Sequence, residues 1–316
     1  MISVFDTSIS TLNVGDSIIM DSVIHELNQL FPYDQQVRVP SHDKIGLTSL
    51  SILRRSRCSL VGGSNILSSH MRRYRQWQIS PLDAYFIRKK VTLMGVGWRD
   101  YQGSADLYTK TLLRVLLRRD GFHSVRDSYT ESKLRAVGVD NVVNTGCPTM
   151  WGLTSEHCKT IPRVRGRAVV FTLTDYNRDV VADTRMIEML RAYYTDISFW
   201  VQGSRDSAYF DSLGSLTKDI RVIPPRLDLY NNALDDDSID YVGTRLHAGI
   251  RALQRGRRTL IVGIDNRANE KRKDFNLPVI ERTRISDVES ILRNDMSTEI
   301  RMPMEQISRW KNQFSS

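Results

Sequence analysis

Short apolar runs alternate with longer amphipathic stretches along the whole 316-residue chain. The runs predict strands, and the recurrence of apolar residues at helical spacing in 16–30 predicts a helix. The predicted strands are 2–5, 36–39, 58–61, 91–96, 123–125, 141–144, 168–172, 197–201, 220–223, 239–242, 259–264 and 279–280. The predicted helices are 16–30, 105–118, 129–137, 184–194, 227–234, 246–255, 287–294 and 304–314. Such an alternation is typical of parallel sheets covered by helices, so the expected fold class is α/β.

Residues 155–167 interrupt the alternation, because they follow neither period and contain Pro162 and Gly166. We interpret this segment as a linker. Single cores rarely grow beyond about 250 to 300 residues, so the length also favours two domains. We predict an N-terminal α/β domain in 1–156, a C-terminal α/β domain in 166–290, and a helical segment in 291–316 that packs back on the N-terminal domain.

The composition excludes several classes of protein. Hydrophobic residues make up 41% and charged residues 26% of the chain, which argues against a disordered, collagenous or membrane-embedded protein. Lys and Arg exceed Asp and Glu by 45 to 36, and the excess lies in short clusters spread along the chain. These clusters favour an anionic partner, such as a phosphorylated substrate, an anionic lipid surface or nucleic acid, but each is explained most simply as solvated surface.

Three cysteines without paired spacing support neither a disulfide framework nor a thiolate zinc site, and no His or Cys cluster has metal-ligand spacing. The N-terminus lacks a basic segment followed by an apolar run of signal-peptide length. The longest apolar runs are strand-sized, so no spanning helix is predicted. We expect a cytoplasmic protein without a bound metal, with at most a peripheral association with the inner face of the membrane.

Ligands of open parallel sheets bind at the carboxyl ends of the strands, so turns from strand to helix are the candidate sites. The strongest is the turn after predicted strand 239–242, where Thr244 is the expected N-cap and Arg245, Leu246 and His247 form the first helical turn. Free amides, the helix dipole and a guanidinium fork together predict an anion site containing an acid–base group, His247. The alternative is a structural ion pair of Arg245 and a satisfied, buried histidine.

Two further arginines follow predicted strands. Arg126 and Arg267 are expected to converge with Arg245 and His247 on one small polyanion, in a cleft between the domains. For Arg126 the alternative is an ion pair with Asp127.

Two turns of the N-terminal half are also candidates: Asn13 and Asp16 at a helix entrance, and Ser64 and Asn65 after a pair of glycines. Neither turn fits the phosphate-loop or dinucleotide patterns. Asp16 has the simpler explanation of a first-turn acid. The acidic run 235–237 precedes a strand, so we interpret it as a turn and not as a metal-binding pair.

As a set, these motifs resemble the polysaccharide pyruvyl transferase family. The resemblance rests on Asn13-Val-Gly-Asp16, Val61-Gly-Gly-Ser, Val125-Arg-Asp127 with Ser132-Lys-Leu-Arg-Ala-Val-Gly138, and above all Gly243-Thr-Arg-Leu-His-Ala-Gly-Ile. It extends from Asn13 to about Pro278. It implies two tandem Rossmann-like domains similar to the GT-B glycosyltransferases. It also implies transfer of pyruvate from phosphoenolpyruvate to hydroxyls of a sugar in a surface polysaccharide or its precursor, with formation of a ketal and release of phosphate.

The resemblance also assigns roles. The family's donor-binding arginine and histidine correspond to Arg245 and His247, with Leu246 and Thr244 beside them, and its Arg-Asp turn corresponds to Arg126. Arg267 stands where the family often has lysine, which changes a point donor into a planar fork.

We expect His247 to protonate the donor, while the acceptor site uses Asn13, Asp16, Ser64 and Asn65, with Asp16 as base. Phosphoenolpyruvate is then a co-substrate, and no cofactor is expected.

Two alternatives remain open. A glycosyltransferase with the same two-domain architecture and a sugar-nucleotide donor would place its arginines in the same half of the chain. A non-catalytic protein that binds nucleic acid or acidic glycan has less support, because no nucleic-acid module is present and aromatic residues are not interleaved with the basic clusters.

Overall fold

The computed structural model describes residues 1–315, which form two compact units. The first unit comprises Met1–Thr11, Ile19–Trp151 and the chain from Met302 onward, and the second comprises Leu12–Ile18 and Gly152–Arg301. The grouping differs from the predicted domains at Leu12–Ile18, which we had placed in the N-terminal half. The predicted linker also begins with a helix, α6 (Ser155–Lys159), because the side chain of Thr154 caps it by accepting from His157 N.

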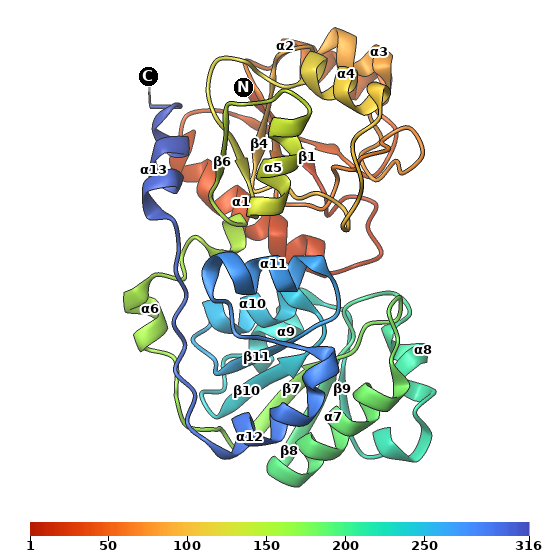
Figure 1. Cartoon of the computed structure of the whole chain (residues 1–316), viewed down its shortest axis with the longest axis vertical. Helices are drawn as coiled ribbons and strands as arrows, with labels where there is room; N and C mark the ends of the chain where they lie inside the picture. Colours follow the sequence, from red (N-terminus) through yellow and green to blue (C-terminus); the bar gives the residue numbers. More distant parts are fainter. Residues whose placement is uncertain (316) are drawn as a thin grey trace. The chain divides into compact units, whose positions relative to one another are not determined.

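The first unit contains a parallel sheet in the order β2-β1-β3-β4 (Figure 1). Its strands are β1 (Ile2–Asp6), β2 (Gln36–Pro40), β3 (Ser59–Gly62) and β4 (Val91–Met94). The parallel pair β5 (His123–Val125) and β6 (Val142–Asn144) continues it, because Val96 bridges to Val125 beyond the end of β4. The helices of this unit are α1 (Gly15–Leu30), whose first residues up to Ile18 are grouped with the second unit, α2 (Leu47–Arg55), α3 (Pro81–Phe86), α4 (Leu107–Leu116), α5 (Ser128–Ala136) and α13 (Met304–Asn312).

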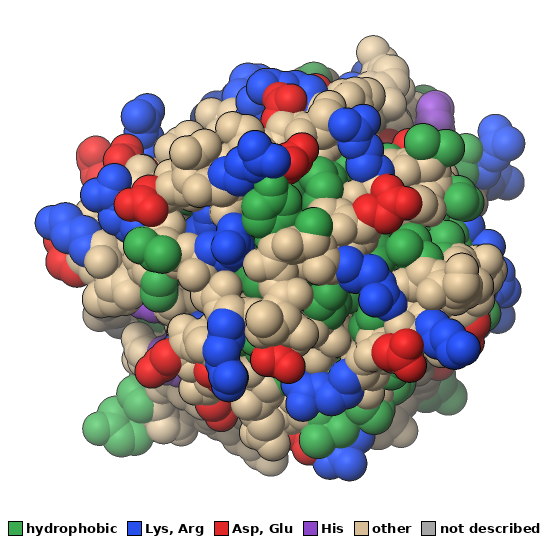
Figure 2. All heavy atoms as spheres, turned by 90° about the horizontal axis from the view of Figure 1, so that it is seen from below, with side chains coloured by type: hydrophobic (Ala, Val, Ile, Leu, Met, Phe, Trp, Pro, Cys, Tyr) green, Lys and Arg blue, Asp and Glu red, His purple; other side chains and the backbone are tan. Residues whose placement is uncertain are grey.

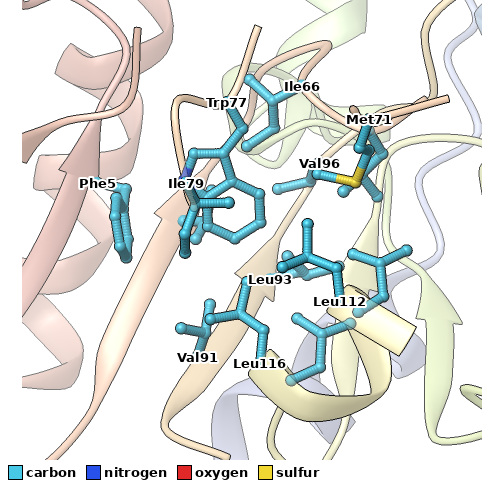
Figure 3. Close-up of a cluster of buried hydrophobic side chains, with 14 of the residues drawn as sticks. Phe5, Ile66, Met71, Trp77, Ile79, Val91, Leu93, Val96, Leu112 and Leu116 are labelled. Atoms are coloured by element: carbon cyan, nitrogen blue, oxygen red, sulfur yellow. The ribbon is translucent and has the colours of Figure 1, made fainter. Parts of the chain in front are cut away.

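Large apolar side chains fill the space between this sheet and its helices. Figure 3 shows Val91 and Leu93 of β4 facing Leu112 and Leu116 of α4. A second buried cluster packs the other face of the sheet against α1 and α13, so both faces are covered. Such burial is the main source of the stability of the unit.

The end of the chain belongs to the first unit. Trp310 of α13 is fully buried, and its ring lies 5.6 Å from that of Trp151. Lys311 forms an ion pair with Glu26 of α1.

The second unit is a six-stranded, all-parallel sheet in the order β12-β11-β10-β7-β8-β9. Its strands are β7 (Ala168–Thr172), β8 (Asp196–Trp200), β9 (Arg221–Ile223), β10 (Ile239–Gly243), β11 (Thr259–Gly263) and β12 (Val279–Glu281). Its longer helices are α7 (Val180–Tyr193), α8 (Asp206–Asp211), α9 (Leu227–Ala233), α10 (Leu246–Gln254), α11 (Asn266–Phe275) and α12 (Val288–Arg293). The chain passes outward from β7 to β9 and then returns to β10 on the other side of β7. The pair β7–β10 is therefore the topological switch point, where ligands bind in such sheets.

Each predicted strand has an observed counterpart within about two residues at either end, so the α/β fold class is confirmed. The prediction for 91–96 is too long, because Gly95 adopts a φ of +65° and ends β4 at Met94. The helices α2, α3, α6, α8 and α11 were not predicted. In residues 1–315, no helix has the length and apolar character needed to cross a bilayer.

Candidate functional site

Arg245 lies at the switch point of the second unit, directly after β10. Its side chain is only 5% exposed and is held by two carboxylates. Nε donates to Asp206 Oδ2 at 3.0 Å, and Nη2 donates to Asp175 Oδ1 at 3.1 Å and also to Asp206 Oδ1. Asp175 follows β7 and Asp206 follows β8, so three neighbouring strands supply one ionic cluster. The structural ion pair that we considered for Arg245 is present.

The Arg245 guanidinium uses only part of its donor set in these contacts. All of its protein hydrogen bonds come from Nε and Nη2, and within residues 1–315 Nη1 has no hydrogen-bond partner. Gly203 lies under the guanidinium, since a Cβ there would be 2.2 Å from Nη2. The carboxylates therefore fix the orientation of Arg245 and leave one edge of its fork for a ligand.

The carboxyl group of Asp206 anchors this cluster. It is completely buried, and it also accepts from the backbone amides of Gly203 at 2.7 Å and Asp175 at 3.2 Å. Burial raises the pKa of Asp206, whereas the charge and hydrogen bonds of Arg245 oppose that rise.

The prediction that Thr244 caps α10 is wrong. The helix begins at Leu246 with Arg245 in the cap position and no side-chain cap. The Thr244 hydroxyl lies 2.8 Å from that of Thr174 and also donates to Thr172 O, because the end of β7 runs beside it. Leu246 and His247 occupy the first turn of α10, as expected, and both are buried.

Arg267 lies near Arg245 through a shared tyrosine that we did not predict. Its Nε donates to Asp265 Oδ2 at 2.9 Å, and its Nη2 donates to Asp265 and to the hydroxyl of Tyr176. The guanidinium of Arg245 lies 5.2 Å from the centre of the same tyrosine ring. Burial lowers the pKa of Arg267, but Asp265 and Tyr176 outweigh it and the pKa is raised. Arg245 and Arg267 thus contact the same tyrosine, Arg245 over the ring and Arg267 at the hydroxyl.

Asn13 belongs to this same unit and not to the first one. Its Oδ1 accepts from Gln202 Nε2 at 2.7 Å and from Gly15 N at 3.1 Å, and Val14 N donates to Gln202 O. Asp16 N in turn donates to Asn13 O, so Asp16 lies in the first turn of α1. Asn13 also forms an isolated antiparallel bridge with Gly203, the glycine under Arg245. Our assignment of this turn to the N-terminal domain is therefore corrected.

Arg126 lies in the first unit and is buried at the carboxyl end of β5. Nε donates to Asp127 Oδ2 at 2.9 Å, and Nη2 donates to Asn65 Oδ1 at 3.0 Å and Trp98 O at 3.2 Å. As with Arg245, a glycine lies under the guanidinium: a Cβ on Gly97 would be 2.0 Å from Nε. The ion pair with Asp127 that we considered as the alternative is present. As in Arg245 and Arg267, Nη1 has no hydrogen-bond partner among residues 1–315.

Ser64 and Asn65 lie beside Arg126. Ser64 is buried, and its carbonyl oxygen accepts from Gly97 N at 2.8 Å. The sequence had assigned Arg126 to the donor and these two residues to the acceptor, but in the structure they form one cluster. The convergence of Arg126 with the arginines of the second unit stays a prediction.

The sequence analysis also missed a histidine at the carboxyl edge of the first sheet. His42 Nδ1 donates to Thr7 O at 3.2 Å, so in the neutral ring Nε2 is an acceptor. Asp6, at the end of the adjacent strand β1, is buried and pairs with Arg38 at 3.1 Å. The sequence could have identified Asp6 and His42 as candidates, because both residues follow predicted strands.

Acidic residues elsewhere have structural partners. Asp235 and Asp237 lie between α9 and β10 and pair with Arg255 and Arg257, as an acidic turn would. Among residues 1–315, no group of three or more His, Cys, Asp or Glu side chains is arranged to hold a metal ion.

Several solved structures have a similar fold. The Methanocaldococcus jannaschii UDP-GlcNAc 2-epimerase in complex with UDP-GlcNAc and UDP has a TM-score of 0.52 at 12% identity, over 94% of both chains. A lipopolysaccharide outer core galactosyltransferase, WaaB, has a TM-score of 0.51 at 11% identity, over 92% of this chain and 88% of that one. S. aureus MnaA in a co-structure with UDP has a TM-score of 0.50 at 12% identity, over 93% and 88%. These similarities establish the GT-B type of fold.

A comparison with curated proteins finds no significant match. The family comparison is more informative, because the model for polysaccharide pyruvyl transferase matches residues 13–266. That range covers most of the chain and contains every predicted site residue except Arg267. The chain therefore belongs to the polysaccharide pyruvyl transferase family.

Proposed function

We propose that the protein transfers pyruvate from phosphoenolpyruvate to two hydroxyls of one sugar, in a surface polysaccharide or its cytoplasmic precursor. The product is a pyruvate ketal, and phosphate is released. Family membership supports the transferase class. The observation that carries the proposal is the orientation of Arg245 and Arg267 around Tyr176, with Nη1 of each left for an anionic ligand at the switch point.

The donor suits this site because phosphoenolpyruvate is small and carries both a phosphate and a carboxylate. Guanidinium groups bind either group through paired N–H donors. The first turn of α10 adds backbone amides and the positive end of the helix dipole beside Arg245. The carboxylates bind Nε and Nη2 of each arginine and so hold the side chain in one orientation before a ligand arrives. Less conformational entropy is therefore lost when a ligand binds.

In the proposed reaction, His247 donates a proton to the methylene carbon of phosphoenolpyruvate, and a sugar hydroxyl attacks the resulting cationic carbon. The C–O bond to phosphate then breaks, and a second hydroxyl of the same sugar attacks the same carbon to close the ketal. One hydroxyl proton replaces the proton that His247 gave, and the other leaves on phosphate. Asp16 is the proposed base for the acceptor, with Asn13, Ser64 and Asn65 as acceptor-binding groups.

The test is incubation with phosphoenolpyruvate and a pool of glycan precursors, followed by phosphate assay and mass spectrometry of the acceptor. We expect phosphate release coupled to gain of a three-carbon acid unit with loss of water. A positioned proton donor contributes about 10² to 10⁴ in rate, so His247→Ala should lose at least a hundredfold in turnover. Arg226→Ala is the control, since Arg226 is exposed and, among residues 1–315, forms an ion pair with Asp228 alone. Near-normal turnover by folded His247→Ala would contradict the assignment.

The second candidate is a glycosyltransferase with a sugar-nucleotide donor. It is favoured by the fold neighbours, two of which are described with UDP and one of which is a galactosyltransferase. This enzyme would release a nucleoside diphosphate and not phosphate. Thermal stabilisation by a sugar nucleotide, with none by phosphoenolpyruvate, would replace the first proposal by this one.

A further inference from the structure

The helices α2 and α3 of the first unit expose large apolar side chains. Leu82, Tyr85 and Phe86 are spaced along one face of α3 and are 71%, 58% and 44% exposed, and Leu47 at the start of α2 is 88% exposed. Figure 1 shows α2, α3 and α4 grouped together at one end of this unit. Single exposed apolar residues are common, but several on one short helix indicate an interaction surface.

Arginine side chains lie against the aromatic rings of α3. The guanidinium of Arg54 lies 5.3 Å from the centre of the Phe86 ring, and that of Arg88 lies 5.2 Å from the Tyr85 ring. Lys90 Nζ donates to Arg54 O at 2.6 Å, so the basic residues after α3 lie next to the end of α2. We call Leu82, Tyr85, Phe86, Arg54 and Arg88 the α2–α3 surface.

The cations of this surface are not neutralised by acidic neighbours. In the described part of the chain, Arg54, Arg55, Arg88 and Lys89 form no ion pair. The basic clusters of the second unit differ, because Arg255, Arg257, Arg258 and Arg272 pair with Asp235, Asp237, Asp240 and Glu281. On the face that Figure 2 shows, Lys and Arg side chains are likewise interspersed with Asp and Glu.

Along the sequence, the net charge of the protein is concentrated in the stretch that contains α2 and α3. Residues 41–110 contain 12 Lys and Arg residues against 4 Asp residues, a net charge of +8, whereas the whole chain has +9. The rest of the chain is therefore almost neutral. A positive region that also exposes apolar and aromatic side chains matches the two components of a membrane surface, anionic head groups and the upper acyl region.

We propose that the α2–α3 surface binds anionic phospholipid bilayers, with Leu82 and Phe86 entering the interface and Arg54 and Arg88 contacting lipid phosphates. Aromatic rings are favoured at the depth of the head groups, and basic residues are attracted by the negative surface potential. The inference does not depend on the proposed function, since lipid binding is measured without any substrate.

The test is sedimentation of the full-length protein with vesicles of phosphatidylcholine, alone or with phosphatidylglycerol added. We expect binding only when phosphatidylglycerol is present, and weaker binding at higher salt. Each Lys or Arg near an anionic bilayer contributes about fivefold in partitioning, so Arg54→Gln with Arg88→Gln should weaken binding by roughly twenty-five-fold. Leu82→Ser with Phe86→Ser should also weaken it.

Matched controls remove the same kinds of side chain elsewhere. Arg226→Gln with Arg293→Gln removes two charges from exposed sites, and Val181→Ser removes an 80% exposed apolar side chain from α7. These variants should bind like the unchanged protein. Far-UV circular dichroism checks that each variant folds, and Leu82→Ser alone provides a milder version, because that side chain is largely exposed.

Several results would overturn the proposal: no sedimentation with either vesicle, equal binding to both vesicles, or equal losses in the control variants. Analytical ultracentrifugation gives a further check. If the protein is a dimer that Leu82→Ser and Phe86→Ser dissociate, the surface is an interface between two copies and not a lipid-binding site.

Discussion

Replacing Asp206 with asparagine tests whether the carboxylate cluster determines the orientation of Arg245. The Asp206 side chain is completely buried and accepts four hydrogen bonds, two from Arg245 and one each from Gly203 N and Asp175 N. Asparagine has nearly the same shape but only one acceptor oxygen. Its NH2 group would face N–H donors, and the buried guanidinium would lose one of its two negative partners.

The expected cost follows from these contacts. Breaking a buried ion pair by removing one partner costs about 3 to 5 kcal/mol. Asp175 remains 3.1 Å from Nη2 and its side chain is 18% exposed, so part of the Arg245 charge stays neutralised. We therefore expect the lower end, about 3 kcal/mol of the free energy of unfolding. For a domain of this size that corresponds to a fall in melting temperature of roughly 6 to 12 °C.

Urea and thermal unfolding, followed by circular dichroism, measure this effect. Asp228→Asn is the control, because it breaks an ion pair with Arg226 in which both side chains are more than half exposed. That change should cost less than about 1 kcal/mol. A loss for Asp206→Asn no larger than the loss for Asp228→Asn would show that the buried cluster does not hold Arg245.

Three further changes have defined outcomes. Gly203→Ala would place Cβ 2.2 Å from Arg245 Nη2, so the guanidinium must move. We expect kcat/KM to fall about tenfold, which corresponds to about 1.4 kcal/mol. Gly152→Ala is the control and should leave kcat/KM unchanged, because a Cβ there meets nothing within 4 Å. Arg267→Lys keeps the charge and should raise the KM for phosphoenolpyruvate less than Arg267→Ala, for which a lost charged hydrogen bond predicts roughly a tenfold rise or more. Burial lowers the pKa of His123 from 6.5 to about 4, so the unfolded chain binds a proton that the folded one excludes. The stability that the neutral ring contributes is present above pH 6.5 and should fall by about 3 kcal/mol as the pH drops to 4. His123→Gln should flatten that part of the urea-derived stability profile, and an unchanged slope would contradict the argument.

The strands could be predicted because they are short, apolar and fully buried. The missed helices lack a comparable pattern. The sequence of α11 is Asn-Arg-Ala-Asn-Glu-Lys-Arg-Lys-Asp-Phe, so few apolar residues mark its buried face. Two others, α3 and α8, are six residues long, which is less than two turns. For such segments packing on the rest of the unit decides the conformation, and periodicity carries little information.

The sequence could identify those residues of the candidate site that directly follow a predicted strand. Arg245, His247 and Arg267 were placed correctly at the carboxyl ends of strands, because a strand and the turn after it are continuous in sequence. The carboxylates that pair with Arg245 are distant from it in sequence. Asp206 lies 39 residues before Arg245 and Asp175 lies 70 residues before it.

The α/β class, the positions of the strands and the turns that carry the arginines could be inferred from the sequence, since each depends on neighbouring residues. Which side chains contact these arginines depends on the folded arrangement of the sheet. The strand order β10-β7-β8 brings Asp175 and Asp206 to Arg245. A separate contact joins Asn13 to Gln202 across 189 residues of sequence. Strand order is fixed by the packing of whole sheets and helices, so no local sequence pattern contains it. The carboxylates that hold Arg126, Arg245 and Arg267 in fixed orientations become known only from the folded structure.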